Sequence, residues 1–234
     1  MRHRYIAVEG PIGVGKSALA ERLAERTGAD LVRDTDGMNP WLEPFYLDPR
    51  ANALHAQLQF LITRVAVLER VGRRTGAPGG TLPRAPVTGG RTGRAAPVGK
   101  RAERAIVAEF IIEKDPLFAE LTLDENEWRL YHALHERLVG ELAGPDLVVY
   151  LQAPVALLIE RIECRGIAFE KRMDSTYLHR LSASYERFFH DFQAAPLLIV
   201  NTASIDLGRD GEALERLVSR VEAFDGGRHY FNPT

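Results

Sequence analysis

One segment near the N-terminus combines glycines, a lysine and a serine at fixed spacing. It reads Gly10-Pro11-Ile12-Gly13-Val14-Gly15-Lys16-Ser17 and fits the pattern G-x-x-x-x-G-K-[ST] at every fixed position. Gly10, Gly13 and Gly15 let the backbone turn several N–H groups toward one point, and a following helix adds partial positive charge there. Lys16 can then reach the β- and γ-phosphates of a nucleotide, while the Ser17 hydroxyl binds Mg²⁺. The segment predicts a nucleoside triphosphate site.

The residues on either side give this segment the context that it needs. Residues 5–8 form a short apolar, β-prone run before it, and residues 18–24 have apolar spacing typical of a helix after it. The alternative is a glycine-rich turn between a strand and a helix that binds nothing. Four fixed positions in the right context favour the nucleotide site.

Bulk composition limits the classes of protein to consider. The chain has 234 residues, of which 45% are hydrophobic and 26% charged, with a net charge of −2. The length suits one α/β domain, or at most two small ones, and the charge indicates no general affinity for nucleic acid or membranes. The single cysteine, Cys164, excludes an internal disulfide and a cysteine-based metal site. No apolar run reaches the length of a signal peptide or membrane span, so we expect a cytoplasmic protein.

Five short apolar runs alternate with helical patterns, which predicts a parallel sheet covered by helices on both faces. The predicted strands are 5–8, 30–33, 105–109, 147–151 and 197–200. Ligands of such sheets bind at the carboxyl ends of the strands. We therefore expect Glu9, Asp34, Glu109 and Gln152 to gather near the phosphate-binding segment.

A long helical pattern covers residues 49–71 and places Gln57 and Arg64 on one side, two turns apart. From spacing alone, a solvated polar face explains this pair better than a binding site.

Two segments carry no clear periodicity. Residues 72–104 are rich in glycine, proline and arginine, which predicts a flexible insertion; a basic arm that contacts phosphate or nucleic acid is the alternative. The polar tail, residues 225–234, is expected to fray.

Further helices are predicted after the third and fourth strands. Asp124, with Glu127 three residues later, is a helix cap for residues 124–142. In the helix that begins at Pro154, Arg161 and Arg165 lie one turn apart. The helix from Asp174 carries aromatic residues at core spacing. A basic segment at 161–172 suits a small-molecule kinase, which closes an arginine-bearing lid over the transferred group. The sequence lacks an Asn-Lys-x-Asp guanine motif and the apolar run ending in Asp-Glu of motor ATPases.

Together these segments resemble the bacterial deoxynucleoside kinase family, which contains deoxyadenosine, deoxyguanosine and deoxycytidine kinases. The resemblance covers nearly everything except residues 72–104. The matching segments are 5–17, 39–42 with 45–46 and 48–49, 57–61 with Arg64, 114–115 with 117–119, 146–152, 160–162 with 165–166, and 185–189.

The resemblance implies roles for particular residues. Gln57 is similar to the family glutamine that hydrogen-bonds the nucleobase, and its amide offers both a donor and an acceptor. Arg64 resembles the arginine that supports the substrate's 5′ end and the catalytic carboxylate. Arg161 and Arg165 resemble the lid arginines, whose one-turn spacing would point both at the phosphates. Glu170 lies where the family lid has an acidic residue near the sugar.

Two positions depart from the family pattern. Asp34 stands where the family usually has a glutamate that acts as general base, so the carboxylate is one methylene shorter. At the end of the third strand, where many relatives have an acid-Arg-Ser run, this chain has Ala108-Glu109-Phe110. Glu109 can still offer a carboxylate to Mg²⁺. Since no arginine is present there, Arg64 and the lid are expected to supply more of the positive charge.

We therefore predict one domain, residues 1–234, with a five-stranded parallel sheet and an arginine-bearing lid. The expected activity is phosphoryl transfer from ATP–Mg²⁺ to the 5′-hydroxyl of a deoxynucleoside. The resemblance favours a purine nucleoside and a homodimer, with no nucleic-acid or membrane partner. Alternatives are a kinase for another small alcohol or for a nucleoside monophosphate, a nucleotide-binding relative without turnover, and a nucleic-acid-binding ATPase that uses the basic insertion.

Overall fold

The computed structural model describes residues 3–34, 39–75, 104–140, 142–167, 170 and 173–233. The strands are β1 (Tyr5–Glu9), β2 (Asp30–Val32), β3 (Ile106–Ala108), β4 (Leu147–Gln152), β5 (Leu197–Asn201) and β6 (Arg228–Phe231). The helices are α1 (Lys16–Thr27), α2 (Leu42–Leu47), α3 (Pro49–Thr75), the 3₁₀ turn η2 (Ile112–Lys114), α4 (Asp115–Thr122), α5 (Glu125–Val139), α6 (Val155–Arg165), α7 (Ser175–Asp191) and α8 (Gly211–Glu222). The predicted α/β class is confirmed.

The six strands form one sheet in the order β2-β3-β1-β4-β5-β6, and every neighbouring pair is parallel. The prediction of five strands was wrong by one, because the tail expected to fray forms β6 beside β5. Gly226 and Gly227, both at positive φ, turn the chain into this strand. As an edge strand, β6 exposes most of its side chains, so it has no apolar run that would reveal it in the sequence.

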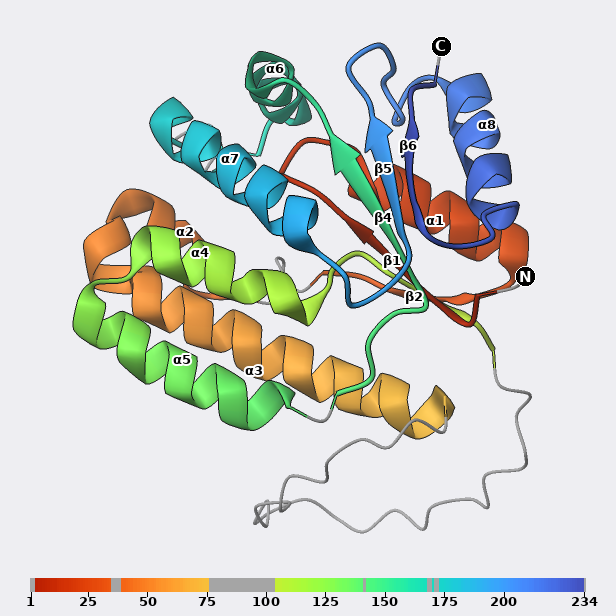
Figure 1. The fold of residues 1–234 in the computed structure, drawn as a ribbon. Coiled ribbons are helices and arrows are strands. Elements are labelled where there is room, and N and C mark those ends of the chain that lie inside the picture. Colours follow the sequence, from red (N-terminus) through yellow and green to blue (C-terminus); the bar gives the residue numbers. More distant parts are fainter. Residues whose placement is uncertain are drawn as a thin grey trace, which may run out of the picture.

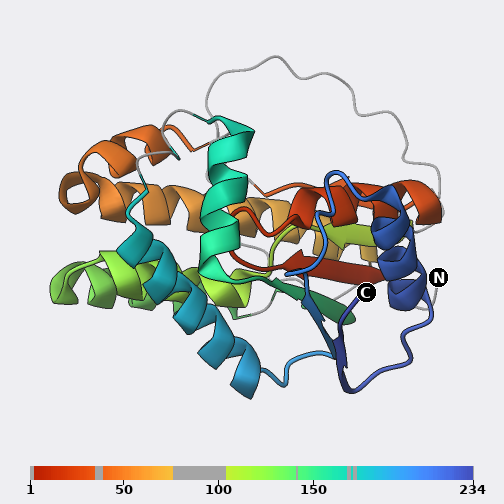
Figure 2. The ribbon, with the colours of Figure 1, turned by 90° about the horizontal axis from the view of Figure 1, so that it is seen from above.

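Helices cover both faces of the sheet (Figures 1 and 2). On one face α1 lies beside α8, and on the other α3, α4, α5 and α7 pack together. Helix α6 follows β4 beyond the carboxyl ends of the strands. The helical arrangement therefore leaves the carboxyl edge of the sheet available for a site.

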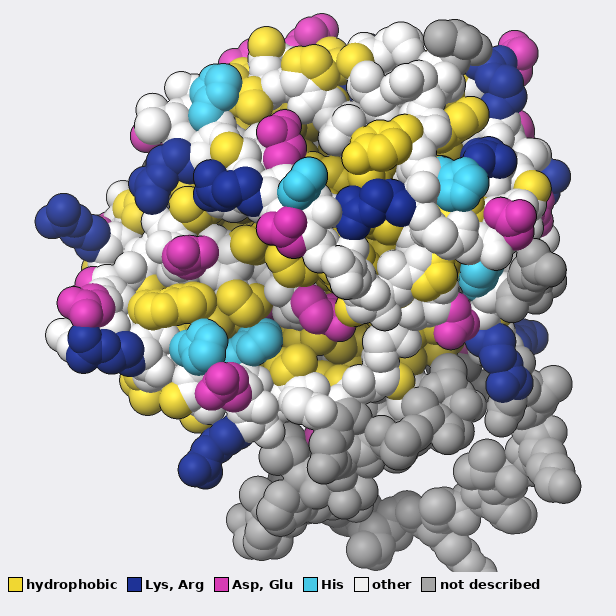
Figure 3. Space-filling model, in the orientation of Figure 1, with side chains coloured by type: hydrophobic (Ala, Val, Ile, Leu, Met, Phe, Trp, Pro, Cys, Tyr) yellow, Lys and Arg dark blue, Asp and Glu magenta, His cyan; other side chains and the backbone are white. Residues whose placement is uncertain are grey.

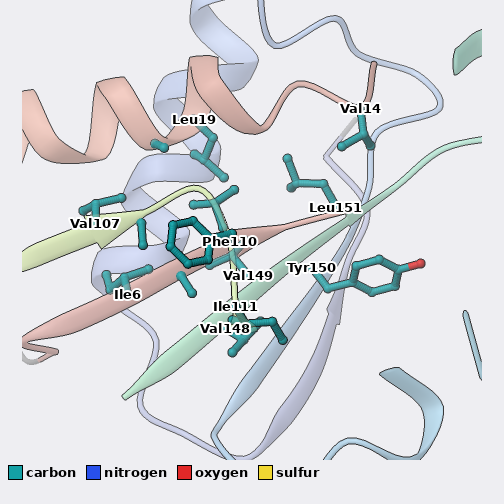
Figure 4. Packing of buried hydrophobic residues seen from close by; sticks show 14 of the residues in the cluster. Ile6, Val14, Leu19, Val107, Phe110, Ile111, Val148, Val149, Tyr150 and Leu151 are labelled. Carbon is teal, nitrogen blue, oxygen red and sulfur yellow. The ribbon is translucent and has the colours of Figure 1, made fainter. Parts of the chain in front are cut away.

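The core is continuous across the sheet. Ile6, Val107 and Val149 are fully buried, and Leu19 of α1 reaches down onto the same layer (Figure 4). Tyr150 and Leu151, neighbours in β4, point to opposite sides, as the two-residue period of a strand requires. Tyr150 stacks on Phe189 of α7 with 4.1 Å between ring centroids. The aromatic residues of α7 are thus core residues, as their spacing predicted.

Helix boundaries follow the sequence signals closely. Asp124 caps α5 with Glu127 in a complete capping box, and Asp174 caps α7. Gly166 ends α6 at a φ of 78°. Helix α3 continues to Thr75, so the insertion predicted at 72–104 begins later than expected. Its remaining residues, 76–103, lie outside the described residues.

Candidate active site

A cavity of about 310 Å³ opens at the carboxyl edge of the sheet. Every site residue predicted from the sequence lines it: Gly10, Gly13, Gly15, Lys16, Ser17, Asp34, Gln57, Arg64, Glu109, Arg161, Arg165 and Glu170. Of the four strand-end residues expected to gather here, Asp34 and Glu109 line the cavity, and Glu9 contacts two of its lining residues, Lys114 and Tyr185. Gln152 is not among the lining residues; its carbonyl accepts a hydrogen bond from the Thr202 N–H instead.

The phosphate-binding segment adopts a conformation that only glycine allows at two positions. Gly10 has a φ of 148°, and a Cβ there would lie 2.4 Å from the Leu151 carbonyl oxygen. Gly13 has a φ of 82°, and a Cβ there would lie 3.0 Å from the Leu158 carbonyl oxygen of α6. The Lys16 ammonium donates to the carbonyl of Gly10 at 2.8 Å and to that of Pro11 at 3.3 Å. The lysine is therefore held across the mouth of the loop.

The Asp34 carboxylate accepts hydrogen bonds from the guanidinium of Arg64. Nε and Nη2 of Arg64 lie 2.9 and 2.8 Å from Asp34 Oδ1, and Nη2 lies 2.9 Å from Oδ2. The other guanidinium nitrogen, Nη1, donates to Asp115 at 2.6 Å. All three side chains are at least nine-tenths buried. Helix α3 thus places Arg64 inside the protein, which excludes the solvated face that spacing alone favoured.

A second buried cation reaches the same carboxylate. The Lys114 ammonium lies 3.3 Å from Asp34 Oδ2 and 3.1 Å from Glu9 Oε2, and its side chain is 2% exposed. Glu9 also accepts from the backbone N–H groups of Gly10 and Ile111 and from the Tyr185 hydroxyl. Lys114, in the turn after β3, therefore adds a buried positive charge beside Arg64 that the sequence did not predict.

These contacts decide the charge state of the cluster. Burial alone would raise the pKa of Asp34, but the charges of Arg64 and Lys114 outweigh it and lower that pKa well below its ordinary value. Burial would lower the pKa of Lys114, yet Glu9 and Asp34 raise it. Asp34 is accordingly an anion and Lys114 a cation at neutral pH.

Asp115 behaves differently. Its burial raises the pKa to about 6, against the opposing charges of Arg64 and Lys114. Its Oδ2 atom and the nearby Tyr131 hydroxyl are both buried without a hydrogen-bond partner. The protonated form is therefore the one that folding favours.

We predict a pH dependence of stability from Asp115. An acid whose pKa rises on folding stabilises the folded state fully below its unfolded pKa of 3.8, and this contribution is lost as the pH rises through about 6. A rise of this size is equivalent to about 3 kcal/mol. Chemical denaturation between pH 4 and 7 should show the wild type losing stability relative to Asp115→Asn. Parallel profiles for the two proteins would contradict the assignment.

Glu109 and Ser17 both line the cavity. Its Oε2 atom accepts from the Asp34 N–H at 3.2 Å, whereas Oε1 is buried without a hydrogen-bond partner and has Arg33 at 3.5 Å. Carboxylate and hydroxyl oxygens suit Mg²⁺, which uses one or two protein ligands together with substrate phosphates. The described part of the chain contains no cluster of three or more His, Cys, Asp or Glu side chains that could hold a metal by itself.

Apolar and aromatic side chains make up much of the remaining cavity lining. They include Phe45, Tyr46, Phe60, Phe118 and Tyr177. Gln57, only 5% exposed, lies among them, and its amide N–H donates weakly to the Thr122 hydroxyl at 3.4 Å. An amide between aromatic walls is a suitable environment for a flat, hydrogen-bonding ring.

The predicted lid arginines take different partners. Arg161 donates to the backbone carbonyls of Thr202 and Ile205, in the loop after β5. Arg165 forms an ion pair with Glu170, which is buried although its partner is half exposed. Both arginines line the cavity, and the expectation that both point at the phosphates stays a prediction. Lys171 and Arg172, the last residues of the basic segment at 161–172, lie outside the described residues.

Comparison with known proteins identifies the family. A family model described as deoxynucleoside kinase matches residues 6–224. The chain belongs to the deoxynucleoside kinase family. It is 28% identical over 222 residues to a deoxyguanosine kinase of Bacillus subtilis, covering 93% of this chain and 96% of the relative. It is 26% identical over 227 residues to a deoxyadenosine/deoxycytidine kinase of the same organism, covering 94% and 92%.

A solved structure agrees on the fold. A deoxyadenosine kinase from M. mycoides, with dCMP and dCDP bound, superposes with a TM-score of 0.71 at 19% identity, covering 94% of this chain and 100% of the other. For this deoxynucleoside kinase family member, no helix among the described residues is both long and apolar enough to cross a membrane.

Sequence reasoning missed part of the site of this family member. Lys114 and Asp115 belong to a matching segment, yet no role was inferred for them, and Tyr185 was counted only as core. The signal in the sequence was the charged pair Lys114-Asp115, which stands between the apolar third strand and an apolar helix start. A lysine between two apolar segments can be buried with an anionic partner. Glu9 was expected near the site, but its contacts with Lys114 and with the backbone N–H groups of Gly10 and Ile111 were not predicted.

Proposed function

We propose that this protein transfers the γ-phosphoryl group of ATP–Mg²⁺ to the 5′-hydroxyl of a deoxynucleoside, giving the 5′-monophosphate. One observation carries the proposal: a single cavity joins a phosphate-binding loop, a buried carboxylate fixed by Arg64, and an aromatic compartment that contains Gln57. The proposed donor, base and acceptor sites therefore share one cavity, as an in-line transfer requires.

Each part has a role in this proposal. The loop residues Gly13, Gly15 and Lys16 bind the triphosphate. Asp34 accepts a hydrogen bond from the 5′-hydroxyl and orients its oxygen toward the γ-phosphorus. Arg64 fixes Asp34 and contributes positive charge near the reacting oxygens. Because charge spreads over the phosphoryl oxygens during transfer, fixed cations there lower the barrier.

The proposed metal ion is Mg²⁺, bound by the Ser17 hydroxyl and by Glu109, directly or through water. The buried Glu109 Oε1 without a hydrogen-bond partner supports this assignment. When bound, the ion neutralises charge on the β- and γ-phosphates. Chelation of the divalent cation should abolish turnover.

The lid is proposed to close over the phosphates through Arg165. Its exposed guanidinium can move from Glu170 to a phosphoryl oxygen, while Glu170 remains buried near the sugar. Arg161 is proposed to act in the same lid, anchored on the loop after β5.

We propose a purine deoxynucleoside as the acceptor, held by Gln57. Replacing Gln57 with Leu keeps the side-chain size but removes both the donor and the acceptor. We expect KM for the nucleoside to rise about 10- to 100-fold, since a buried base would lose its hydrogen bonds. KM for ATP should stay unchanged. Steady-state kinetics with Gln59→Leu, on the same helix, gives the control; equal effects of the two substitutions would contradict the assignment.

The alternatives predict other acceptors or none. A nucleoside monophosphate kinase needs cations for the acceptor phosphate, whereas the described residues around Gln57 are mainly apolar and aromatic. A relative without turnover would bind ATP only. The deciding experiment offers each deoxynucleoside and its 5′-monophosphate separately with ATP–Mg²⁺. We expect phosphorylation of a deoxynucleoside; phosphorylation of monophosphates alone, or ATP binding without product, would overturn the proposal.

We also propose a cytoplasmic homodimer. The single cysteine suits a reducing compartment. Ile62 on α3 is 58% exposed, and Leu130 and Leu134 are exposed on the neighbouring α5. Figure 3 shows hydrophobic side chains among charged ones over the region of α5. Light scattering should give twice the mass of the 26.1 kDa chain, and a monomeric mass would contradict the dimer.

A further inference from the structure

The proposed donor site and the proposed base follow two strands that are not neighbours in the sheet. The phosphate-binding loop follows β1, whereas Asp34 follows β2, and β3 lies between them in the sheet. No β-ladder hydrogen bond therefore fixes one strand end against the other. Because phosphoryl transfer requires the attacking oxygen to be in line with the γ-phosphorus, some other contact must hold Asp34 in register with the loop.

Lys114 occupies the gap. It is the last residue of η2, the turn after β3, and its ammonium lies between Glu9 of β1 and Asp34 after β2. The distances to the two carboxylates are 3.1 and 3.3 Å, and the lysine is 2% exposed. A cation this deeply buried needs compensating anions, and these two carboxylates provide them.

Glu9 is a rigid support for this contact. Its carboxylate is fully buried and accepts from the Gly10 N–H at 2.8 Å, which belongs to the phosphate-binding loop. It also accepts from the Ile111 N–H at 3.0 Å and the Tyr185 hydroxyl at 3.1 Å. Glu9 therefore cannot move without displacing the loop, the turn after β3 and helix α7 together.

We propose that Lys114 is a positioning residue that, through Glu9, fixes Asp34 relative to the phosphate-binding loop. The inference rests on the proposed function, in which Asp34 meets the 5′-hydroxyl. Arg64 holds Asp34 from the α3 side, and Lys114 holds its Oδ2 atom from the β1 side. Arg64 sets the plane of the carboxylate through both of its oxygens, whereas Lys114 links Oδ2 to Glu9 and thereby to the phosphate-binding loop.

The test measures kcat of Lys114→Met in the wild-type and in the Asp34→Asn background. A displacement of about 1 Å can cost about 100-fold in rate, so we expect kcat to fall about 10- to 100-fold in the wild-type background. KM for ATP and for the nucleoside should change little. In the Asp34→Asn background, the same substitution should change kcat less than about 2-fold, because a residue that acts through Asp34 has nothing left to position.

A second variant covers the risk that Lys114→Met does not fold, since it leaves Glu9 buried without its cation. Glu9→Gln with Lys114→Met removes both charges and keeps an acceptor for the backbone donors of Glu9. It should melt near the wild-type temperature and bind ATP, yet show the same loss of kcat. Wild-type kcat in this folded double variant, or a full additional loss in the Asp34→Asn background, would overturn the inference. Full activity of Asp34→Asn alone would instead overturn the proposed function.

Discussion

Asp34→Asn is expected to lower kcat by about 100-fold or more while leaving ATP binding intact, within the range that a general base contributes. The substitution keeps the size of the side chain but removes the anion that receives the 5′-hydroxyl proton. The lowered pKa of Asp34 keeps it ionised at neutral pH, so it is always available as an acceptor. Steady-state kinetics and ATP titration measure the two effects separately.

Asp30→Asn is the matched control for this prediction. Asp30 lies at the opposite end of β2 and pairs with Arg104 at 3.7 Å, far from the carboxyl edge of the sheet. It should leave kcat unchanged. Undiminished activity of Asp34→Asn would mean that another group accepts the proton, and the role given to this carboxylate would be wrong.

Arg64→Met is expected to have the largest effect on the folded protein. Its guanidinium compensates two buried carboxylates, Asp34 and Asp115, and removing one partner of a buried ion pair costs about 3–5 kcal/mol. Kinase activity should fall at least as far as in Asp34→Asn, because Asp34 also loses its orientation. Chemical denaturation and steady-state kinetics give the two measurements.

Arg70→Met, on the exposed side of the same helix, should leave both stability and kcat unchanged. Arg64→Lys separates charge from geometry: it retains the cation but loses the two-pronged contact with Asp34, so stability should recover more than kcat. An Arg64→Met protein as stable as the wild type would contradict the buried network.

The sequence predicted the parts of the fold that rest on local signals. Apolar runs located five strands, and the capping box at Asp124 located the start of α5. The phosphate-binding segment was recognisable because its glycines, Lys16 and Ser17 have fixed spacing and one conformation. β6 was missed because an exposed edge strand needs no apolar run, only a neighbour to pair with.

The interior of the site was harder to predict because its contacts join distant segments. Lys114 meets Glu9 across 105 positions of sequence and meets Asp34 across 80. Nothing in the spacing of these residues shows that all three charges are buried together. Arg64 could be assigned to the site only through family resemblance, since its spacing from Gln57 equally fits a solvated face. The partners of Arg161 in the loop after β5 likewise depend on tertiary packing.

The most direct test of the central claim follows a labelled γ-phosphate. Wild-type protein is incubated with Mg²⁺, γ-labelled ATP and one purine deoxynucleoside, and the products are separated and identified by mass spectrometry and ³¹P NMR. The cavity predicts that the label moves to the 5′-oxygen of the deoxynucleoside and that ADP forms in equal amount. Label released only as inorganic phosphate, or retained on ATP, would contradict the proposed kinase.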